Sequence, residues 1–176
     1  GHDVMLLDLF LGRDNEKILP VYRNKNSKYR FNYIVPEQEP DLTAIRSSVN
    51  SESDFIGNGV IDLCKDADVV FMGLHGSVGE NGQLQATFDM YGINYTGTKY
   101  IGSLLAMDKD ISKKLMRENG ILTADWQHIK LNNDNDFRNI KHPCVVKPCS
   151  CGSSVGVTIV ENKGQLNRAI DYAKKY

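Results

Sequence analysis

A lysine followed by a loop of serines and glycines is the stretch of this sequence best suited to chemistry. The stretch reads VVKPCSCGSSVGV over residues 145–157, and its lysine is Lys147. Glycines let backbone N–H groups approach an anion, serine hydroxyls add donors, and the lysine adds positive charge at the mouth of the loop. The pattern indicates a strand, a loop that suits a triphosphate, and a returning strand. Taken alone, however, a serine–glycine loop between two strands is most often only a hairpin.

The position of the lysine excludes one familiar nucleotide-binding motif. In the G-x-x-x-x-G-K-[ST] loop the lysine follows the glycines and a helix begins directly after them. Here Lys147 precedes the glycines, and an apolar run follows them instead. The sequence therefore points to a different nucleotide fold.

A glycine-rich turn carries the second pair of reactive side chains. The turn HGSVGENG, residues 75–82, places the imidazole of His75 and the carboxylate of Glu80 beside the start of a predicted helix. A helix N-terminus favours a carboxylate, and an imidazole can bond a substrate or shuttle a proton. The pair could therefore hold a zwitterionic or anionic substrate. Without further context, the simpler interpretation is favoured, in which the histidine satisfies turn carbonyls and the glutamate caps the helix.

The cysteines at positions 64, 144, 149 and 151 raise the question of disulfides or a metal site. A chain of this size has enough core to fold without disulfides, so reduced thiols are expected. Three of the cysteines could be combined with His142, but the Cys-x4-Cys-x-Cys spacing lacks the paired C-x-x-C pattern of structural zinc. Cys144 is also expected to point into a buried strand. We predict no metal site here.

Length, composition and charge indicate a globular protein with one large domain or two small ones. The chain has 176 residues, 41% of them hydrophobic, and its 21 basic and 22 acidic residues are mixed along the sequence. The formal net charge of -1 offers no basic field for nucleic acid or an anionic membrane. No apolar run approaches the ~20 residues that span a bilayer, and the N-terminus has no charged leader before an apolar segment. We expect a cytoplasmic protein that binds neither nucleic acid nor membrane.

Apolar periodicity and capping residues predict the elements that position the two loops. The continuous apolar run over 68–74 fits a strand of a parallel sheet, and a helix over 83–91 follows the 75–82 turn. In open α/β sheets, ligands bind where such loops leave the strands. Further strands are predicted at 3–10, 17–22, 29–35, 93–96, around Trp126, at 145–146 and at 157–160. Further helices are predicted at 59–67, at 101–107, at 109–119 with Asp108 as N-cap, and after Asn162, with Gly92 and Gly120 as C-terminal stops.

These elements predict an α/β fold in two parts. Residues 1–100 would form a small parallel-sheet N-terminal domain, and residues 101–176 would begin a second domain that holds the 145–157 loop. The sequence begins abruptly before a strand and stops inside a helix at Tyr176. We therefore expect a piece of a longer protein.

Three segments together resemble the D-alanine–D-alanine ligases of the ATP-grasp superfamily. They are HGSVGENGQLQ at 75–85, YTGTKYIGSLLAMDK at 95–109 and VVKPCSCGSSVGV at 145–157. Each segment alone is common, but the three in this order and spacing are specific. The resemblance runs from about residue 69 to the C-terminus and extends more faintly over the first strand. It implies a pre-ATP-grasp N-terminal domain followed by the first part of an ATP-grasp domain.

The resemblance implies roles only for residues that match the family. Lys109 and Lys147 would contact the phosphates of ATP. Ser153 matches the serine that helps to hold substrate and the closed active site, and we take it as the catalytic serine. His75 and Glu80 match the pair on the substrate side. The full set of matching ATP-binding positions is Lys109, Lys147, Ser153, Ser154, Val155 and Gly156.

The resemblance also implies a reaction and its cofactors. Family members use ATP, with magnesium, to phosphorylate the carboxylate of one D-alanine, and the amine of a second D-alanine attacks the acyl phosphate. The product, D-alanyl-D-alanine, serves peptidoglycan synthesis. The family's opening segment, its adenine pocket and its acidic magnesium ligands have no counterpart in these 176 residues. We therefore expect the isolated chain to bind ATP weakly and not to turn over, with the magnesium ligands in a missing C-terminal part.

Several alternatives stay open at this point. A ligase that joins D-alanine to D-serine or D-lactate, or another ATP-grasp ligase, would use the same three segments. A non-catalytic nucleotide-binding module would also fit. Cys151 stands where many family members have a glutamate, which changes the charge of the loop. Family members are commonly dimers, so a homodimer is one expectation that the sequence leaves open.

Overall fold

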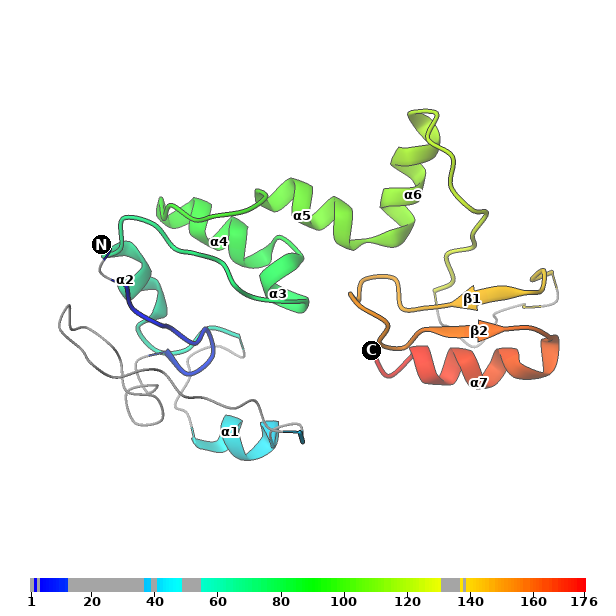
Figure 1. Ribbon diagram of the computed structural model, residues 1–176, viewed down its shortest axis with the longest axis horizontal. Helices are drawn as coiled ribbons and strands as arrows, with labels where there is room; N and C mark the ends of the chain where they lie inside the picture. The colour runs from blue at the N-terminus through cyan, green and yellow to red at the C-terminus, as the bar shows by residue number, and fades with distance from the viewer. Residues whose placement is uncertain are drawn as a thin grey trace. The chain divides into compact units, whose positions relative to one another are not determined.

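A computed structural model describes residues 2, 4–12, 37–38, 41–48, 55–130, 137 and 139–176 (Figure 1). The chain divides into two compact units, Gly1–Val69 and Val70–Tyr176. Both loops that the sequence singles out lie in the second unit. The domain boundary predicted at residue 100 is a different kind of boundary, because it follows the domains of the family and not the compact units. It stays a prediction.

The first unit contains two short helices among its described residues. α1 spans Leu42–Ser48 and α2 spans Val60–Lys65. α1, which the sequence does not predict, begins after Asp41, whose carboxylate accepts the backbone N–H groups of Thr43 and Ala44 at 3.0 and 3.1 Å. α2 confirms the helix predicted over 59–67.

The N-terminal segment differs from its prediction. The sequence predicts a strand over 3–10, but residues 4–10 form no strand. The carboxylate of Asp8 accepts the N–H groups of Phe10 and Leu11 at 2.9 and 2.8 Å. A short polar side chain that bonds the following backbone favours a turn over a strand. The strands predicted at 17–22 and 29–35 lie outside the described residues.

Four helices follow one another over residues 77–118 of the second unit. They are α3 (Ser77–Glu80), α4 (Gln83–Tyr91), α5 (Tyr100–Met107) and α6 (Lys109–Glu118). α3 packs against α4 and α5, and the chain of contacts continues from α4 to α5 and from α5 to α6. Leu84 and Phe88 form the buried side of α4. The helices predicted at 83–91, 101–107 and 109–119 are thus confirmed, and α3 replaces part of the predicted turn.

The two apolar runs of the N-terminal part lie parallel but pair only once. Val70 and Tyr95 form an isolated parallel bridge, with the N–H of Val70 donating to Asn94 at 2.8 Å and that of Thr96 donating to Val70 at 3.0 Å. The runs at 68–74 and 93–96 therefore keep the parallel direction that the sequence predicts. Full strands, which the sequence also predicts, do not form there.

The 145–157 stretch joins two antiparallel strands. β1 spans Cys144–Val146 and β2 spans Thr158–Val160, as predicted. α7, Lys163–Ala173, lies against both strands (Figure 1), and Asn162 caps it by accepting the N–H of Gly164 at 3.1 Å. The core under the strands is made by Val160, Leu166, Ala169 and Ile170. This small sheet and its helix hold both ends of the lysine–serine loop.

The segment around Trp126 is the clearest wrong prediction. The sequence predicts a strand there, but residues 121–130 contain none. The indole N–H of Trp126 bonds to Asp110 of α6 at 2.8 Å, so side-chain bonds rather than a ladder hold the segment. The polar sequence of residues 132–141 also favours a loop or weak helix, and most of this stretch lies outside the described residues.

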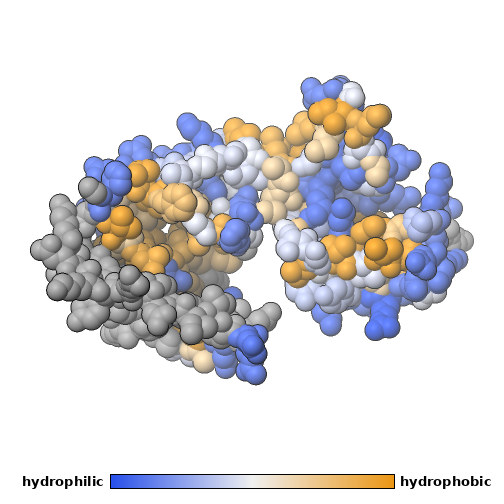
Figure 2. Space-filling view, viewed as in Figure 1, coloured by the Kyte–Doolittle hydropathy of each residue, from blue (hydrophilic) through white to orange (hydrophobic). Residues whose placement is uncertain are grey.

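The visible surface of the second unit carries several exposed apolar side chains. Figure 2 shows them over β1 and β2 and near the end of α6. Val145 and Ile159 remain 51% and 69% exposed because they lie on the sheet face opposite α7, and Leu122 is fully exposed. Among the described residues, no helix has the length and apolar character needed to cross a membrane.

Candidate active site

The lysine–serine loop has a tight base where Gly156 meets Pro148. A Cβ placed on Gly156 would lie 2.6 Å from the Pro148 side chain, and Gly156 has a φ of 70°. Both the close approach and the left-handed backbone require glycine at this position. The fold of the loop therefore depends on the glycine that the sequence assigns to the phosphate-covering segment.

Ser153 has an unusual backbone for a serine. Its φ is 57°, and no other non-glycine residue with positive φ is found among the described residues. A left-handed conformation at a residue with a Cβ costs of order 1–3 kcal/mol and is often found at functional sites. Ser153 and Ser154 are both exposed, so their hydroxyls are accessible to a ligand.

Lys109 joins α6 to the loop. It is the first residue of α6, and its ammonium group donates to the carbonyl oxygens of Cys149 and Cys151 at 3.2 and 2.5 Å. Its backbone N–H also donates to the Cys149 carbonyl, at 3.1 Å. The structure thus brings Lys109 to the same loop as Lys147, although the two lysines are far apart in sequence.

Lys147 is in the opposite situation from Lys109. It is exposed, and its ammonium group has no hydrogen-bond or ion-pair partner in the part of the chain that the structure describes. Ammonium groups bind phosphate as point charges, so an unpaired lysine beside exposed serines suits an anionic ligand. The two lysines therefore differ: one braces the loop and the other is available to a ligand.

The N-cap of α6 also contacts the loop. One carboxylate oxygen of Asp108 accepts the N–H groups of Asp110 and Ile111, each at 2.9 Å, and the thiol of Cys149 donates to the same oxygen at 3.4 Å. The hydrogen bond from Ile111 is the largest cause that lowers the pKa of Asp108, and the Cys149 thiol adds to it. The cap predicted from the sequence is confirmed, and it has a further role in anchoring the loop.

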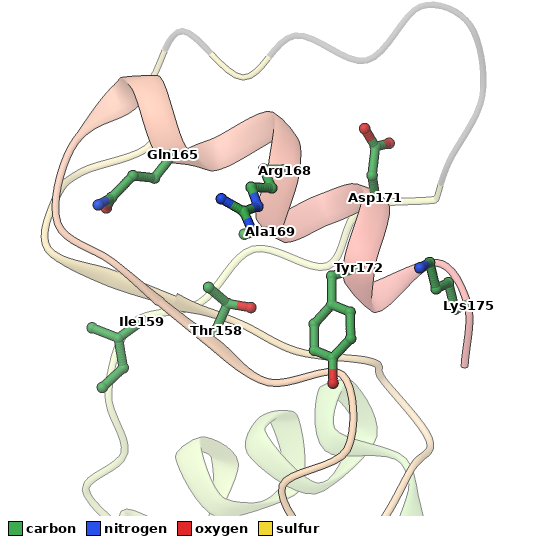
Figure 3. A pocket seen from close by; sticks show the side chains of 8 residues that line it. All are labelled: Thr158, Ile159, Gln165, Arg168, Ala169, Asp171, Tyr172 and Lys175. Atoms are coloured by element: carbon green, nitrogen blue, oxygen red, sulfur yellow. The ribbon is translucent and has the colours of Figure 1, made fainter.

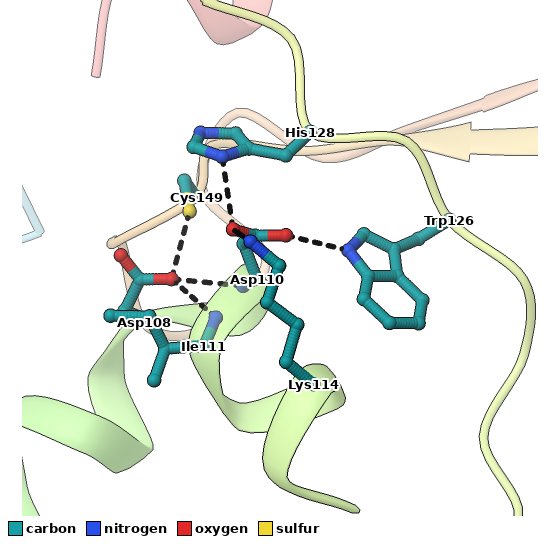
Figure 4. Close-up of polar contacts among 7 residues, drawn as sticks. All are labelled: Asp108, Asp110, Ile111, Lys114, Trp126, His128 and Cys149. Atoms are coloured by element: carbon teal, nitrogen blue, oxygen red, sulfur yellow. Dashed lines mark hydrogen bonds and ion pairs between the residues drawn. The ribbon is translucent and has the colours of Figure 1, made fainter. Parts of the chain in front are cut away.

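A buried carboxylate two residues after the N-cap, that of Asp110, holds a cluster that the sequence did not predict (Figure 4). Asp110, 7% exposed, bonds to Lys114 at 2.7 Å, to the Trp126 indole N–H at 2.8 Å and to His128 Nδ1 at 3.1 Å. The bonds from Lys114 and Trp126 are the largest causes that lower its pKa to about 2. The Asp110–Lys114 spacing of four residues was a visible signal, but nothing local pointed to Trp126 or His128.

The turn with His75 and Glu80 lies close to the loop. The Glu80 carboxylate accepts the N–H of Gly76 at 2.5 Å, and a Cβ on Gly152 would lie 3.8 Å from the same oxygen. His75 is exposed and makes no side-chain hydrogen bond to the residues that the structure describes. The structure therefore brings the Glu80 carboxylate close to the loop that contains Ser153. His75 is the residue before Gly76, whose N–H bonds to that carboxylate.

One cavity lies away from these residues. It has a volume of about 610 Å³ and opens between α7 and β2 (Figure 3). Its lining contains none of the predicted site residues; it consists of Thr158, Ile159, Gln165, Arg168, Ala169, Asp171, Tyr172 and Lys175. Within the described ranges, no group of three or more His, Cys, Asp or Glu side chains could hold a metal ion. The candidate site is therefore the open surface formed by the lysine–serine loop, the start of α6 and the 75–80 turn.

Two family descriptions match the chain. Residues 10–98 match the one described as D-ala D-ala ligase N-terminus, and residues 115–176 match the one described as D-ala D-ala ligase C-terminus. Together they include the 75–80 turn and the whole lysine–serine loop. Lys109 lies between the two matched ranges.

Curated relatives match along almost the whole chain. The D-alanine–D-alanine ligase of Lacticaseibacillus casei (strain BL23) is 34% identical over 177 residues, which cover 97% of this chain and 48% of the relative. The ligase of Pediococcus pentosaceus is 34% identical over 182 residues, which cover 100% of this chain and 51% of the relative. The chain thus spans about half the length of these curated relatives.

Solved structures agree with the sequence matches. The D-alanine–D-alanine ligase of Bacillus anthracis complexed with ATP has a TM-score of 0.58 and 38% identity, covering 64% of this chain and 38% of that one. The VanG D-Ala:D-Ser ligase of Enterococcus faecalis has a TM-score of 0.55 and 35% identity, covering 62% and 34%. Because both family descriptions match most of the chain and the curated relatives match 97% or more of it, the chain belongs to the D-alanine–D-alanine ligase family.

Proposed function

We propose that the whole protein is an ATP-dependent ligase that forms D-alanyl-D-alanine for peptidoglycan synthesis in the cytoplasm. The observation that carries this proposal is the 34% identity to curated D-alanine–D-alanine ligases along 97% or more of the chain. The loop supports it, since it carries exposed serines, a lysine without a partner among the described residues, and a base that depends on Gly156. The substrates would be ATP and D-alanine.

The reaction proceeds in two steps that conserve all atoms. A carboxylate oxygen of the first D-alanine attacks the γ-phosphorus of ATP, which gives an acyl phosphate and ADP. The amine of the second D-alanine then attacks the acyl carbon, and phosphate leaves as the amide bond forms. Activation is needed because a carboxylate has no good leaving group. The protein's task is to position the partners and to neutralise the phosphate charge.

Each residue of the site has a role in this scheme. Lys147 pairs with the phosphates, and Lys109 does so while it anchors the loop. Ser153 is the catalytic serine, which bonds substrate and the closed loop. His75 and Glu80 act on the amino-acid side. The rest of the phosphate-covering loop is Ser154, Val155 and Gly156.

The described residues fit ATP better than they fit magnesium. The loop offers donors and positive charge to phosphate, whereas the residues that the structure describes contain no cluster of acidic ligands for a metal. If the enzyme uses magnesium, as the family implies, its ligands lie outside these described residues. Association of the whole protein into a homodimer is a further expectation that comes from the family alone.

A ligase with a different acceptor is the second candidate. The specific observation in its favour is the VanG D-Ala:D-Ser ligase of Enterococcus faecalis, whose structure is 35% identical and has a TM-score of 0.55. D-Lactate is a further acceptor to test, and another ATP-grasp ligase would share the same site. A non-catalytic nucleotide-binding module would bind ATP without turnover. These candidates differ in products, so one assay distinguishes them.

The test is amino-acid-dependent release of ADP by the whole protein. We expect release with D-alanine and none with L-alanine, and the product identified by mass spectrometry should be D-alanyl-D-alanine. A mixed product when D-serine or D-lactate is supplied with D-alanine would favour the second candidate. ATP binding without ADP release under any of these conditions would leave only the binding module.

A further inference from the structure

A buried glutamine braces the turn that carries Glu80. Gln85 lies on α4 and is 5% exposed. Its amide nitrogen donates to the carbonyl oxygen of Gly79 at 2.6 Å. Gly79 is the residue before Glu80, in the single turn of α3. The bond therefore connects a packed helix to the backbone that orients the Glu80 carboxylate.

The side-chain oxygen of Gln85, at the other end of the same amide, lacks a hydrogen-bond donor among the described residues. The Gln85 side-chain oxygen is buried and accepts no hydrogen bond from the residues that the structure describes. A buried acceptor without a partner costs free energy, and an apolar side chain of the same length would avoid that cost. Packing alone therefore does not account for a glutamine here. What it supplies that a methionine cannot is the donor to Gly79.

The turn that receives this bond has little freedom once it is held. Its N–H at Gly79 donates to the Gly76 carbonyl at 3.1 Å, and the Gly76 N–H donates to the Glu80 carboxylate. A Cβ at Gly79 would lie 2.5 Å from the Leu74 side chain, so the turn packs directly against the preceding segment. A shift of the Gly79 carbonyl would consequently move the Glu80 carboxylate.

We propose that Gln85 is a positioning residue for Glu80, and that through Glu80 it sets the affinity of the enzyme for D-alanine. This inference rests on the proposed function, because Glu80 acts on the amino-acid side of that reaction. Gln85 does not touch the substrate, since its side chain is buried. Its effect on the reaction is carried by the backbone of the 75–80 turn.

The first test is Gln85→Met in the whole protein. We expect KM for D-alanine to rise on the order of tenfold, within the range that a displacement of about 1 Å produces. KM for ATP and kcat should stay unchanged, because the variant should weaken the binding of D-alanine equally in the ground state and in the transition state. Gln85→Asn keeps an amide but is one methylene too short to reach Gly79, so it should show the same split. An unchanged KM for D-alanine in both variants overturns the proposal.

Gln165→Met is the matched control. Gln165 is an exposed glutamine that also bonds one backbone group, because its side-chain oxygen accepts the N–H of Glu161 at 2.9 Å. It lies on α7, away from the 75–80 turn. Its substitution should leave KM for D-alanine unchanged. An equal rise in this control would mean that the effect is not specific to Gln85.

A double-mutant cycle with Glu80→Gln tests whether Gln85 acts through Glu80. If it does, adding Gln85→Met to the Glu80→Gln enzyme causes little further rise in KM for D-alanine. If the two effects multiply, Gln85 acts independently of Glu80 and the proposal is overturned.

Hydrogen exchange separates failure of this proposal from failure of the proposed function. If the wild-type protein does not turn over D-alanine, the proposed function fails on its own. Exchange of the Gly76 N–H still reports the brace, because that group bonds to Glu80. Faster exchange in Gln85→Met than in wild type supports the brace. Equal exchange rates overturn it.

Discussion

Asp110 is the charged side chain that is buried among the described residues, with an exposed fraction of 7%. Its carboxylate is nearly buried and accepts bonds from Lys114, Trp126 and His128, which together tie the 121–130 segment to α6. Lys113 and Arg117 also lie over the Trp126 ring, at 5.3 and 4.4 Å from its centroid. The indole is therefore held by a carboxylate at its edge and by cations near its ring.

This environment predicts a pH-dependent contribution to stability. The pKa of Asp110 is about 2 in the folded protein, below its ordinary value of 3.8. Its stabilising effect is therefore fully present above pH 4 and is lost as the pH falls towards 2. Asp110→Asn should melt at a lower temperature than wild type at pH 7, and the difference should shrink on acidification. Thermal unfolding from pH 7 to pH 2 measures this.

Asp125→Asn is the control for the Asp110 prediction. Asp125 pairs with Arg117 at 3.2 Å, but its side chain is 97% exposed. Exposed ion pairs contribute little, so this variant should melt like wild type across the pH range. A difference between Asp110→Asn and wild type that stays constant down to pH 2 would contradict the assignment of the effect to ionised Asp110.

The two lysines of the site should respond differently to substitution. Lys147→Met is expected to raise KM for ATP roughly ten- to hundredfold, the equivalent of about 1.5–3 kcal/mol for a charged hydrogen bond. It should not change the melting temperature without nucleotide, because its ammonium bonds to none of the described residues. Lys109→Met should raise KM for ATP and also lower the melting temperature, since the Cys151 carbonyl loses its ammonium donor and the Cys149 carbonyl keeps only the backbone N–H of residue 109.

Steady-state kinetics with thermal melts measures both variants, and Lys130→Met, an exposed lysine outside the site, is the control. Equal melting temperatures for Lys109→Met and Lys147→Met would show that the Lys109 brace adds no stability.

The sequence could identify both lysines because they belong to recognisable segments. It could not separate the braced from the unpaired one, since that depends on a contact across 40 residues.

At the scale of elements, α6 begins where the loop is attached. Asp108 is the N-cap of α6 and also receives the Cys149 thiol. Replacing an N-cap aspartate with alanine typically costs about 1 kcal/mol. Asp108→Ala should therefore lower the free energy of unfolding by about that amount, and Asp108→Asn, which can still cap, by much less. Urea denaturation measures the difference; equal losses in both variants would point to the thiol contact rather than the cap.

The elements that the sequence predicts well are those with local signals. α4, α6 and α7 have capping residues at the expected positions, and the Asp108 and Asn162 side chains accept the backbone N–H groups of α6 and α7 as predicted. The strand predicted around Trp126 fails because a distant carboxylate, on α6, takes the indole N–H. The runs at 68–74 and 93–96 have strand-like composition but pair through a single bridge. Composition predicts the parallel direction there but not the burial, since Val69 and Phe71 are 56% and 82% exposed. The extent of pairing depends on neighbouring strands that periodicity does not reveal.

At the scale of the whole molecule, the chain divides into two compact units, and it matches about half of each curated relative. We expect the 176 residues alone to release no ADP with D-alanine, whereas the whole protein does. The reason for this expectation is that the chain spans only about half the length of the curated relatives it matches. Parallel assays at equal concentration test this, and D-alanine-dependent ADP release by the short chain would contradict it.

The backbone of Ser153 has a consequence for which residues the position can accept. A φ of 57° is costly for serine and free for glycine, although glycine loses more entropy on folding. Ser153→Gly should therefore leave stability unchanged or raise it by up to about 1 kcal/mol, while activity falls with the loss of the hydroxyl. In a library randomised at position 153, a screen for folded protein alone should enrich glycine, whereas growth that depends on the enzyme should retain serine. Sequencing both pools would reveal whether this position trades stability for catalysis.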